Sequence, residues 1–216
     1  MNRKTLVLLF FVFLMGCGPY IYFKSPQPDR KKNLSSFPKN ITGTYISEAD
    51  SSMLSIEPTN ISKNRYEKMY MSIESFKEET GDTVVKDTSF VFTDNWLIKM
   101  TVMGDSVYIN SSREEVVFTI SENQLLRKYG GYYFLNFKDS NDLWRVELIK
   151  LTKDTLEFGS ILTKEDIERI KGITSVESYI DSTDSGKSTK YYLNPKRREI
   201  RKILKCRSMG EKFVKQ

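Results

Sequence analysis

The chain has 216 residues, of which 34 are Lys or Arg and 28 are Asp or Glu, so its formal net charge is +6. It contains no His, which excludes histidine triads, histidine metal ligands and histidine acid–base shuttles. Its two cysteines, Cys17 and Cys206, are too few for a cysteine metal cluster or a framework of several disulfides.

The first residues are typical of a secretory leader. Arg3 and Lys4 precede ten uncharged apolar residues, 6–15, which are too few to cross a bilayer because a spanning helix needs about 20. Leu14-Met15-Gly16-Cys17 closes this run, and the motif in this position resembles the lipobox of bacterial lipoproteins. The resemblance implies that residues 1–16 are a signal peptide and that Cys17 is lipidated, with palmitate or a similar acyl chain. A plain secretory leader and an uncleaved anchor are the alternatives.

Two features after the cysteine bear on its location. Gly18 rather than Asp follows Cys17, and no acidic run comes next. By resemblance to sorted lipoproteins, these features imply a lipid-anchored protein of the bacterial cell envelope, in the outer membrane and facing the periplasm. The membrane is therefore an expected partner, and Cys206 is expected to be a lone thiol.

Residues 17–40 are expected to hold the lipidated cysteine and a flexible tether. Prolines at positions 19, 26, 28 and 38 disfavour helix and central strand, and polar residues fill the gaps. Aromatic residues at the start of this stretch, such as Tyr20 and Tyr22, are expected at the headgroup boundary, where amphipathic rings are favoured.

Residues 41–162 have the pattern of successive short strands. Segments rich in Val, Ile, Thr and aromatic residues are separated by turn signals about every 8–12 residues, which indicates an antiparallel β-sandwich or β-barrel. Trp144, Val146 and Leu148 alternate with charged residues, as in a strand that buries one face. Another strand, with partial alternation, is expected over residues 66–76.

The C-terminal part is expected to contain two helices. Thr163 as N-cap predicts a short helix over residues 163–172. Strands are expected at 173–180 and 190–193, and a last helix follows, with Asn194 as its cap and Pro195 as its first residue.

The apolar stripe of this last helix is formed by Ile200, Ile203 and Leu204 at helical spacing. With it, residues 41–216 are expected to form a single β-rich domain that ends in a basic helix.

Charge is distributed unevenly along the chain. Residues 41–186 carry 16 basic and 25 acidic side chains, a net charge of −9, whereas residues 187–216 carry +9. This asymmetry predicts contact between the basic helix and an anionic surface or partner. The candidate contact residues are Lys196, Arg197, Arg198, Arg201, Lys202 and Lys205. The alternative is that the helix pairs its cations with the acidic body of the chain.

Nucleic acid is not an expected partner, because no nucleic-acid-binding motif is present.

No group of residues indicates a reaction. Gly186-Lys187-Ser188 is not a phosphate loop, because Asp181 stands where the loop needs its first glycine. The acidic pairs lack the context of a glycosidase or calcium site. We therefore expect a non-enzymatic protein with no cofactor and no metal.

Gly43-x-Tyr45 opens the first strand of the β-rich stretch and is followed by hairpins and a terminal helix. This arrangement resembles the lipocalin-like domains of Bacteroidota lipoproteins. The resemblance implies an up-and-down barrel with an apolar cup for a small hydrophobic ligand. The side chains expected to face such a cup are Tyr45, Phe92, Trp96, Tyr108, Phe118, Phe134 and Trp144.

Two functions are therefore predicted. The first is binding of a small hydrophobic ligand in a β-barrel. The second is an envelope scaffold or assembly factor that contacts a protein or anionic lipid through its basic helix.

Overall fold

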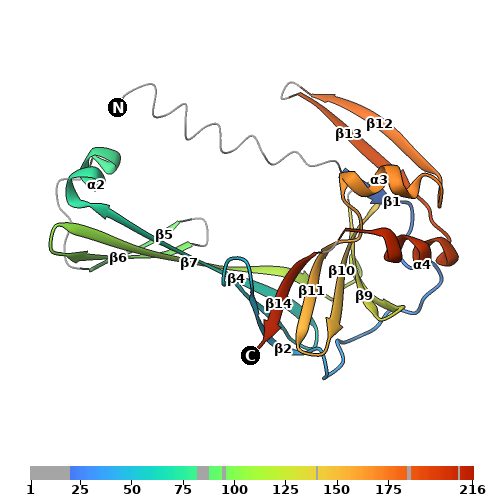
Figure 1. Cartoon of the computed structure of the whole chain (residues 1–216), viewed down its shortest axis with the longest axis horizontal. Helices are drawn as coiled ribbons and strands as arrows, with labels where there is room; N and C mark the ends of the chain where they lie inside the picture. Colours follow the sequence, from blue (N-terminus) through green and yellow to red (C-terminus); the bar gives the residue numbers. More distant parts are fainter. Residues whose placement is uncertain (1–19, 82–87, 94–95, 140, 184–185, 209) are drawn as a thin grey trace. The chain divides into compact units, whose positions relative to one another are not determined.

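The computed structural model describes residues 20–81, 88–93, 96–139, 141–183, 186–208 and 210–216. The protein is mainly β, with 53% strand and 14% helix, which confirms the predicted fold class at that level. Its strands form a large mixed sheet that does not close, so an open β fold or a sandwich describes the architecture (Figure 1).

The chain divides into two compact units. The first comprises Met1–Leu34, Ser121–Lys150 and Glu157–Gly210, and the second comprises Ser35–Ile120, Leu151–Leu156 and Glu211–Gln216. The single domain expected over residues 41–216 stays a prediction. Its residues fall into both units: the last residues of the chain join the second unit, while the residues before position 35 belong to the first. Local sequence patterns predict neither of these two assignments.

Within the described residues, seven strands contribute to the first unit, and β10 and β11 run on into the second. Their bounds are β1 (Tyr20–Phe23), β8 (Gln124–Tyr129), β9 (Tyr132–Lys138), β10 (Trp144–Thr152), β11 (Thr155–Ser160), β12 (Val176–Thr183) and β13 (Gly186–Leu193). Six of them lie in the order β12-β13-β1-β10-β9-β8. β1 runs parallel to β13, with Tyr20 opposite Lys190, and antiparallel to β10. The sheet is therefore mixed, and the β1–β13 pair departs from the expected antiparallel arrangement.

The N-terminal segment from residue 20 onward is folded, not a flexible tether. The Asn136 side chain on β9 accepts a hydrogen bond from the Gln27 N–H at 2.5 Å and donates one to the Gln27 carbonyl oxygen at 2.9 Å. Arg127 on β8 donates to the carbonyl oxygen of Pro28 at 2.9 Å and to Asn33 Oδ1 at 2.8 Å. Prolines exclude regular pairing here, but side chains more than 90 residues away satisfy the backbone polar groups instead.

Two helices complete the first unit, α3 (Lys164–Ile170) and α4 (Arg197–Cys206), and they pack against each other (Figure 1). The predicted cap of α3 is confirmed at the backbone of Thr163, whose N–H donates to Asp166 Oδ2 at 2.8 Å. α4 begins two residues later than expected, at Arg197, because the chain is still extended at Lys196.

The second unit contains the remaining described strands and one helix. Their bounds are β2 (Gly43–Ser47), β3 (Met53–Ile56), β4 (Asn60–Ser72), α2 (Ile73–Thr80), β5 (Thr88–Thr93), β6 (Trp96–Met103), β7 (Ser106–Thr119) and β14 (Glu211–Lys215). The strands lie in the order β14-β2-β3-β4-β7-β6-β5. β14 pairs antiparallel with β2 and buries Phe213 completely, so the end of the chain is a strand and not part of the predicted terminal helix.

The strand expected over residues 66–76 ends at Ser72, and a helix follows it. Ser72 caps α2, since its Oγ accepts a hydrogen bond from the Ser75 N–H at 3.0 Å. Phe76, which has the spacing of a strand residue, is a buried side chain of this helix instead. A serine cap followed by Glu74 in the first turn is the sequence signal for this change.

Candidate functional site

Helix α4 is fixed to the first unit by its apolar stripe. Ile200 and Ile203 are completely buried in one cluster with Trp144 of β10 and with Ile167 and Ile170 of α3. Burying two such side chains contributes about 3–6 kcal/mol by transfer arithmetic. The position and rotation of α4 are therefore set by packing against protein.

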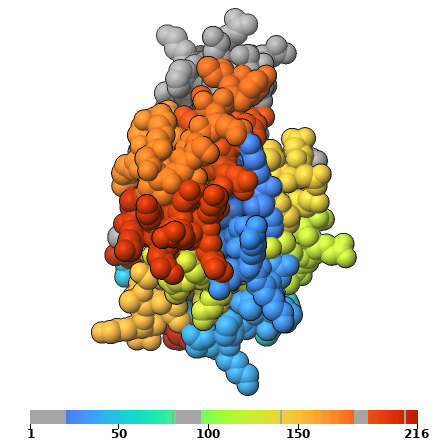
Figure 2. All heavy atoms as spheres, turned by 90° about the vertical axis from the view of Figure 1, so that its right-hand side faces the viewer, coloured from blue at the N-terminus to red at the C-terminus, as the bar shows by residue number. Residues whose placement is uncertain are grey.

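The opposite side of α4 carries its cations. Successive residues of an α-helix are rotated by about 100°, so Arg197, Arg198, Arg201, Lys202 and Lys205 fall within an arc of about 140°. The two buried isoleucines lie on the other side of the helix axis. We call these five residues, together with the preceding Lys196, the basic arc. All six side chains are exposed, and Figure 2 shows α4 (red) at the surface.

The cations of the basic arc are not neutralised within the described part of the chain. No ion pair there involves any of the six, and Arg201 only places its guanidinium over the ring of Tyr129, 5.9 Å from the centroid. The alternative in which the helix pairs its cations with acidic residues of the chain therefore does not describe these residues. Their positive charge faces solvent, where it is available to an anionic partner.

Arg207 differs from the arc, although its sequence position suggests the same solvated face. Its guanidinium forms an ion pair with Glu157, and only 5% and 12% of the two side chains are exposed. Glu157 Oε1 also accepts a hydrogen bond from the Gly210 N–H at 3.0 Å. The helix has ended at Cys206, so helical spacing no longer sets the direction of the Arg207 side chain. Cys206 itself is a free, half-buried thiol.

A hollow lies at the start of α4. It has a volume of about 590 Å³ and is lined by Asp29, Arg30, Asn194, Pro195, Lys196, Arg197 and Arg198. Figure 2 shows the two contributing segments, the N-terminal one in blue and α4 in red, side by side at the surface. Glu199 already occupies the end of the helix, since its Oε2 accepts from the Lys196 N–H at 2.8 Å and from Thr174 Oγ1 at 3.1 Å. The positive charge of the hollow therefore comes from its basic side chains and not from the N-terminus of the helix.

Arg30 is the one cation of this hollow that sequence reasoning does not identify. It lies in the segment expected to be a flexible tether, so nothing places it beside a helix 160 residues later. The feature of the sequence that points to a cationic surface here is the net charge of +4 over residues 24–40. Arg30 forms an ion pair with its neighbour Asp29, at 3.5 Å, and its side chain is 91% exposed.

The residues predicted to face an apolar cup are distributed over both units. Tyr45 and Phe118 are completely buried in the second unit, and Phe134 and Trp144 are buried in the first. Trp96 and Tyr108 are half-buried in the second unit, whereas the side chain of Phe92 lies outside the described residues. The Tyr45 hydroxyl donates to the Ile41 carbonyl oxygen at 2.7 Å, and burial raises its pKa. The four buried aromatics fill the cores of their own units.

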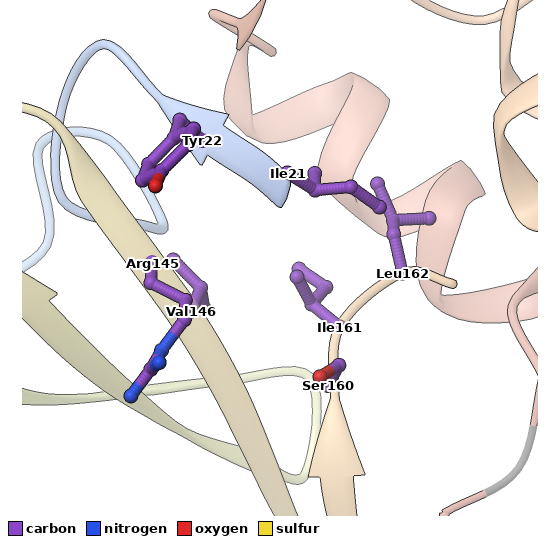
Figure 3. A pocket seen from close by; sticks show the side chains of 7 residues that line it. All are labelled: Ile21, Tyr22, Arg145, Val146, Ser160, Ile161 and Leu162. Atoms are coloured by element: carbon purple, nitrogen blue, oxygen red, sulfur yellow. The ribbon is translucent and has the colours of Figure 1, made fainter. Parts of the chain in front are cut away.

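None of these seven residues lines the apolar hollow of the first unit shown in Figure 3. That hollow has a volume of about 90 Å³ and is lined by Ile21, Tyr22, Arg145, Val146, Ser160, Ile161 and Leu162. Pockets for small ligands typically have about 300–1,000 Å³. The hollow is therefore too small for a ligand of ordinary size in the described conformation.

Comparison of the chain with protein-family models, with curated proteins and with solved structures finds no match. Among the residues that the structure describes, no three His, Cys, Asp or Glu side chains are placed to hold a metal ion. None of the helices in those residues has the length and apolar character needed to span a membrane. Cys17 and the leader lie outside the described residues, so their processing stays a prediction.

Proposed function

We propose that the protein is a lipid-anchored scaffold of the bacterial cell envelope that binds a partner protein with an acidic surface through the basic arc of α4. The observation that carries the proposal is the set of six exposed cations, without an ion pair in the described residues, on a helix fixed by a buried stripe. Anchoring at Cys17 supplies the envelope location.

The placement of the apolar stripe favours a protein partner over direct insertion into a bilayer. Amphipathic helices that bind membranes bury their apolar face in the lipid boundary. In α4 that face is already occupied by the core of the first unit, through Ile200 and Ile203. Only electrostatic attraction and hydrogen bonding remain for the partner, and the three arginines of the arc suit carboxylates because a guanidinium binds them in a bidentate manner.

The test is site-specific photo-crosslinking in cells of the source organism. A photoreactive residue replaces Lys205, at the edge of the arc, and a matched control replaces Glu168, an exposed residue on α3. We expect an adduct with an acidic protein from position 205, none from position 168, and loss of the adduct when Arg198→Glu and Lys202→Glu are combined.

Two results would overturn the proposal. One is an adduct that survives the charge reversal. The other is binding of the Cys17→Ser protein to vesicles with 30% anionic lipid, lost on the same reversal, together with no protein adduct. The second result would assign the arc to anionic lipid.

Binding of a small hydrophobic ligand is the second candidate. The apolar hollow at Ile21, Val146 and Ile161 favours it, and a lipocalin-like barrel would provide a larger cup. We place it second because the hollow is small and the sheet is open in the described conformation. Native mass spectrometry of protein from its own envelope tests it: a retained lipid-sized ligand supports this function, and its absence refutes it.

A further inference from the structure

Three adjacent strands of the first unit, β12, β13 and β1, carry several tyrosines on one face. β12, β13 and β1 are adjacent, and their register places Tyr179 opposite Lys190, and Tyr192 opposite both Glu177 and Tyr22. Residues paired in this way share one face of a sheet, as do residues two apart along a strand. We call Tyr22, Tyr179, Lys190 and Tyr192 the tyrosine face.

The opposite face of the same strands is the core side. Phe23 and Leu193 belong to the buried cluster that also holds Ile200 and Ile203 of α4. Val176 and Tyr191 pack against that cluster. The tyrosine face therefore points away from the core, and 63% of Tyr179 is exposed. The rings of Tyr22 and Tyr192 stack, with their centroids 6.0 Å apart.

The start of β1 is close to the predicted lipid attachment. Tyr20 is three positions after Cys17, and each step spans at most about 3.6 Å, so the two Cα atoms are at most about 11 Å apart. Tyr20 pairs with Lys190, which pairs with Tyr179, and neighbouring strands are about 4.8 Å apart. With no long tether between them, an acyl group at Cys17 holds these three strands at the bilayer surface.

We propose that the tyrosine face lies on the headgroup layer of the bilayer that holds Cys17. The inference rests on the lipidation contained in the proposed function and adds the orientation of the first unit. Tyrosine is the residue type enriched at membrane–water boundaries, because its ring is apolar and its hydroxyl is polar. The carboxylate of Glu177 is paired with Lys24 Nζ at 2.7 Å, which reduces its repulsion from anionic headgroups.

This orientation has a consequence for the basic arc. α4 covers the core side of the strands, and its cations point away from its own buried stripe. The buried cluster therefore lies between the tyrosine face and the arc, and the arc is turned away from the anchoring bilayer. The partner of the arc is accordingly a molecule in the aqueous compartment.

Tyr179 and Ile180 form a matched pair for testing the orientation. They are adjacent on β12, are 63% and 62% exposed, and point to opposite faces of the sheet. The lipidated full-length chain with Cys206→Ser is labelled with an environment-sensitive fluorophore at Tyr179→Cys or at Ile180→Cys and bound to phospholipid vesicles. Nitroxide-labelled lipids then quench fluorophores that lie at the headgroup boundary.

We expect quenching at position 179 to exceed that at position 180 at least threefold. Equal quenching, or stronger quenching at position 180, overturns the orientation while leaving the anchor and the scaffold function intact. A signal at position 179 that depends on protein concentration and not on lipid also overturns it, because a second copy then covers the face. If the wild-type chain incorporates no fatty-acid probe, the anchor itself is refuted and the proposed function fails with it.

Discussion

The side-chain amide of Asn136 binds both backbone polar groups of Gln27, although 109 residues separate the two in the chain. Both residues are completely buried. The contact fastens the N-terminal segment to β9 and explains why a stretch with several prolines is ordered.

Asn136→Ala is expected to destabilise the protein by about 2–4 kcal/mol. The change leaves a buried N–H and a buried carbonyl without their partner, at about 1–3 kcal/mol each when unsatisfied, and partial access of water reduces the total. Urea unfolding of the purified protein measures the effect. Asn141→Ala, at an exposed turn position, is the control and should change the free energy of unfolding by less than about 0.5 kcal/mol. Equal effects at the two positions would contradict the structural role of the contact.

Removing the charge of Glu157 is expected to lower the free energy of unfolding. Glu157→Gln keeps the shape of the side chain but leaves the guanidinium of Arg207 buried without its counter-charge, which costs about 3–5 kcal/mol for a buried pair. Glu168→Gln is the matched control, because its pair with Lys171 is exposed and contributes at most about 1 kcal/mol. Thermal or urea unfolding of both variants checks the difference, and similar midpoints for the two would refute it.

Gly210 is expected to tolerate no side chain. A Cβ there would meet the carbonyl group of Phe158, with its carbon at 2.7 Å, and the Gly159 nitrogen at 3.1 Å. Since backbone cannot shift as easily as a flexible side chain, Gly210→Ala should destabilise the protein by about 1–3 kcal/mol. Gly172→Ala has nothing within 4 Å and should be neutral or slightly stabilising. The same unfolding experiment distinguishes the two variants. An unchanged free energy of unfolding for Gly210→Ala would show that the backbone at this position does not follow the described path.

Asp50 is expected to make the stability of the second unit depend on pH in the acid range. The nearby Ser52 side chain and the Ser52 backbone N–H, which donates to Asp50 Oδ1 at 2.9 Å, lower the pKa of Asp50 to about 2. A carboxyl whose folded pKa is depressed stabilises the fold above its unfolded pKa of about 3.9, and this contribution is lost as pH falls towards 2. Asp50 is exposed, so solvent screening keeps the effect below about 1 kcal/mol. Asp50→Asn should therefore destabilise the protein at pH 7 but hardly at pH 2. An equal loss of stability at pH 7 and at pH 2 would rule out the ionised carboxylate of Asp50 as its cause.

The elements that sequence predicts are those with enough residues to show a period or a cap. β10 has nine residues and alternates from Trp144 to Leu148, Thr163 caps α3, and the stripe of Ile200 and Ile203 gives the orientation of α4. The exposure of the six arc cations follows from that stripe, so this part of the candidate site is predictable. The seven residues of the apolar cup stay a prediction, because large aromatics at strand positions have the same pattern whether they line a cup or fill a core.

The missed elements are short and are stabilised by distant partners. β1 has four residues and β14 has five, too few for a periodic signal, and their places depend on β13 and β2. Arg30 lies in the hollow at α4, within a loop that Asn136 and Arg127 hold by hydrogen bonds. Such contacts connect residues more than 90 positions apart, and no local pattern encodes them.

β1 has a further consequence for how the protein matures. In the strand order of the first unit, this earliest described strand lies between β13 and β10, which are made more than a hundred residues later. The second unit likewise awaits β14, which pairs with β2 from more than 160 residues earlier in the chain. Neither unit can complete its pairing before these later strands have been synthesised, so the early strands stay unpaired while the residues between them are made. Pairing between strands that are far apart in the chain is slow, so such a protein completes its sheet later than one assembled from neighbouring hairpins.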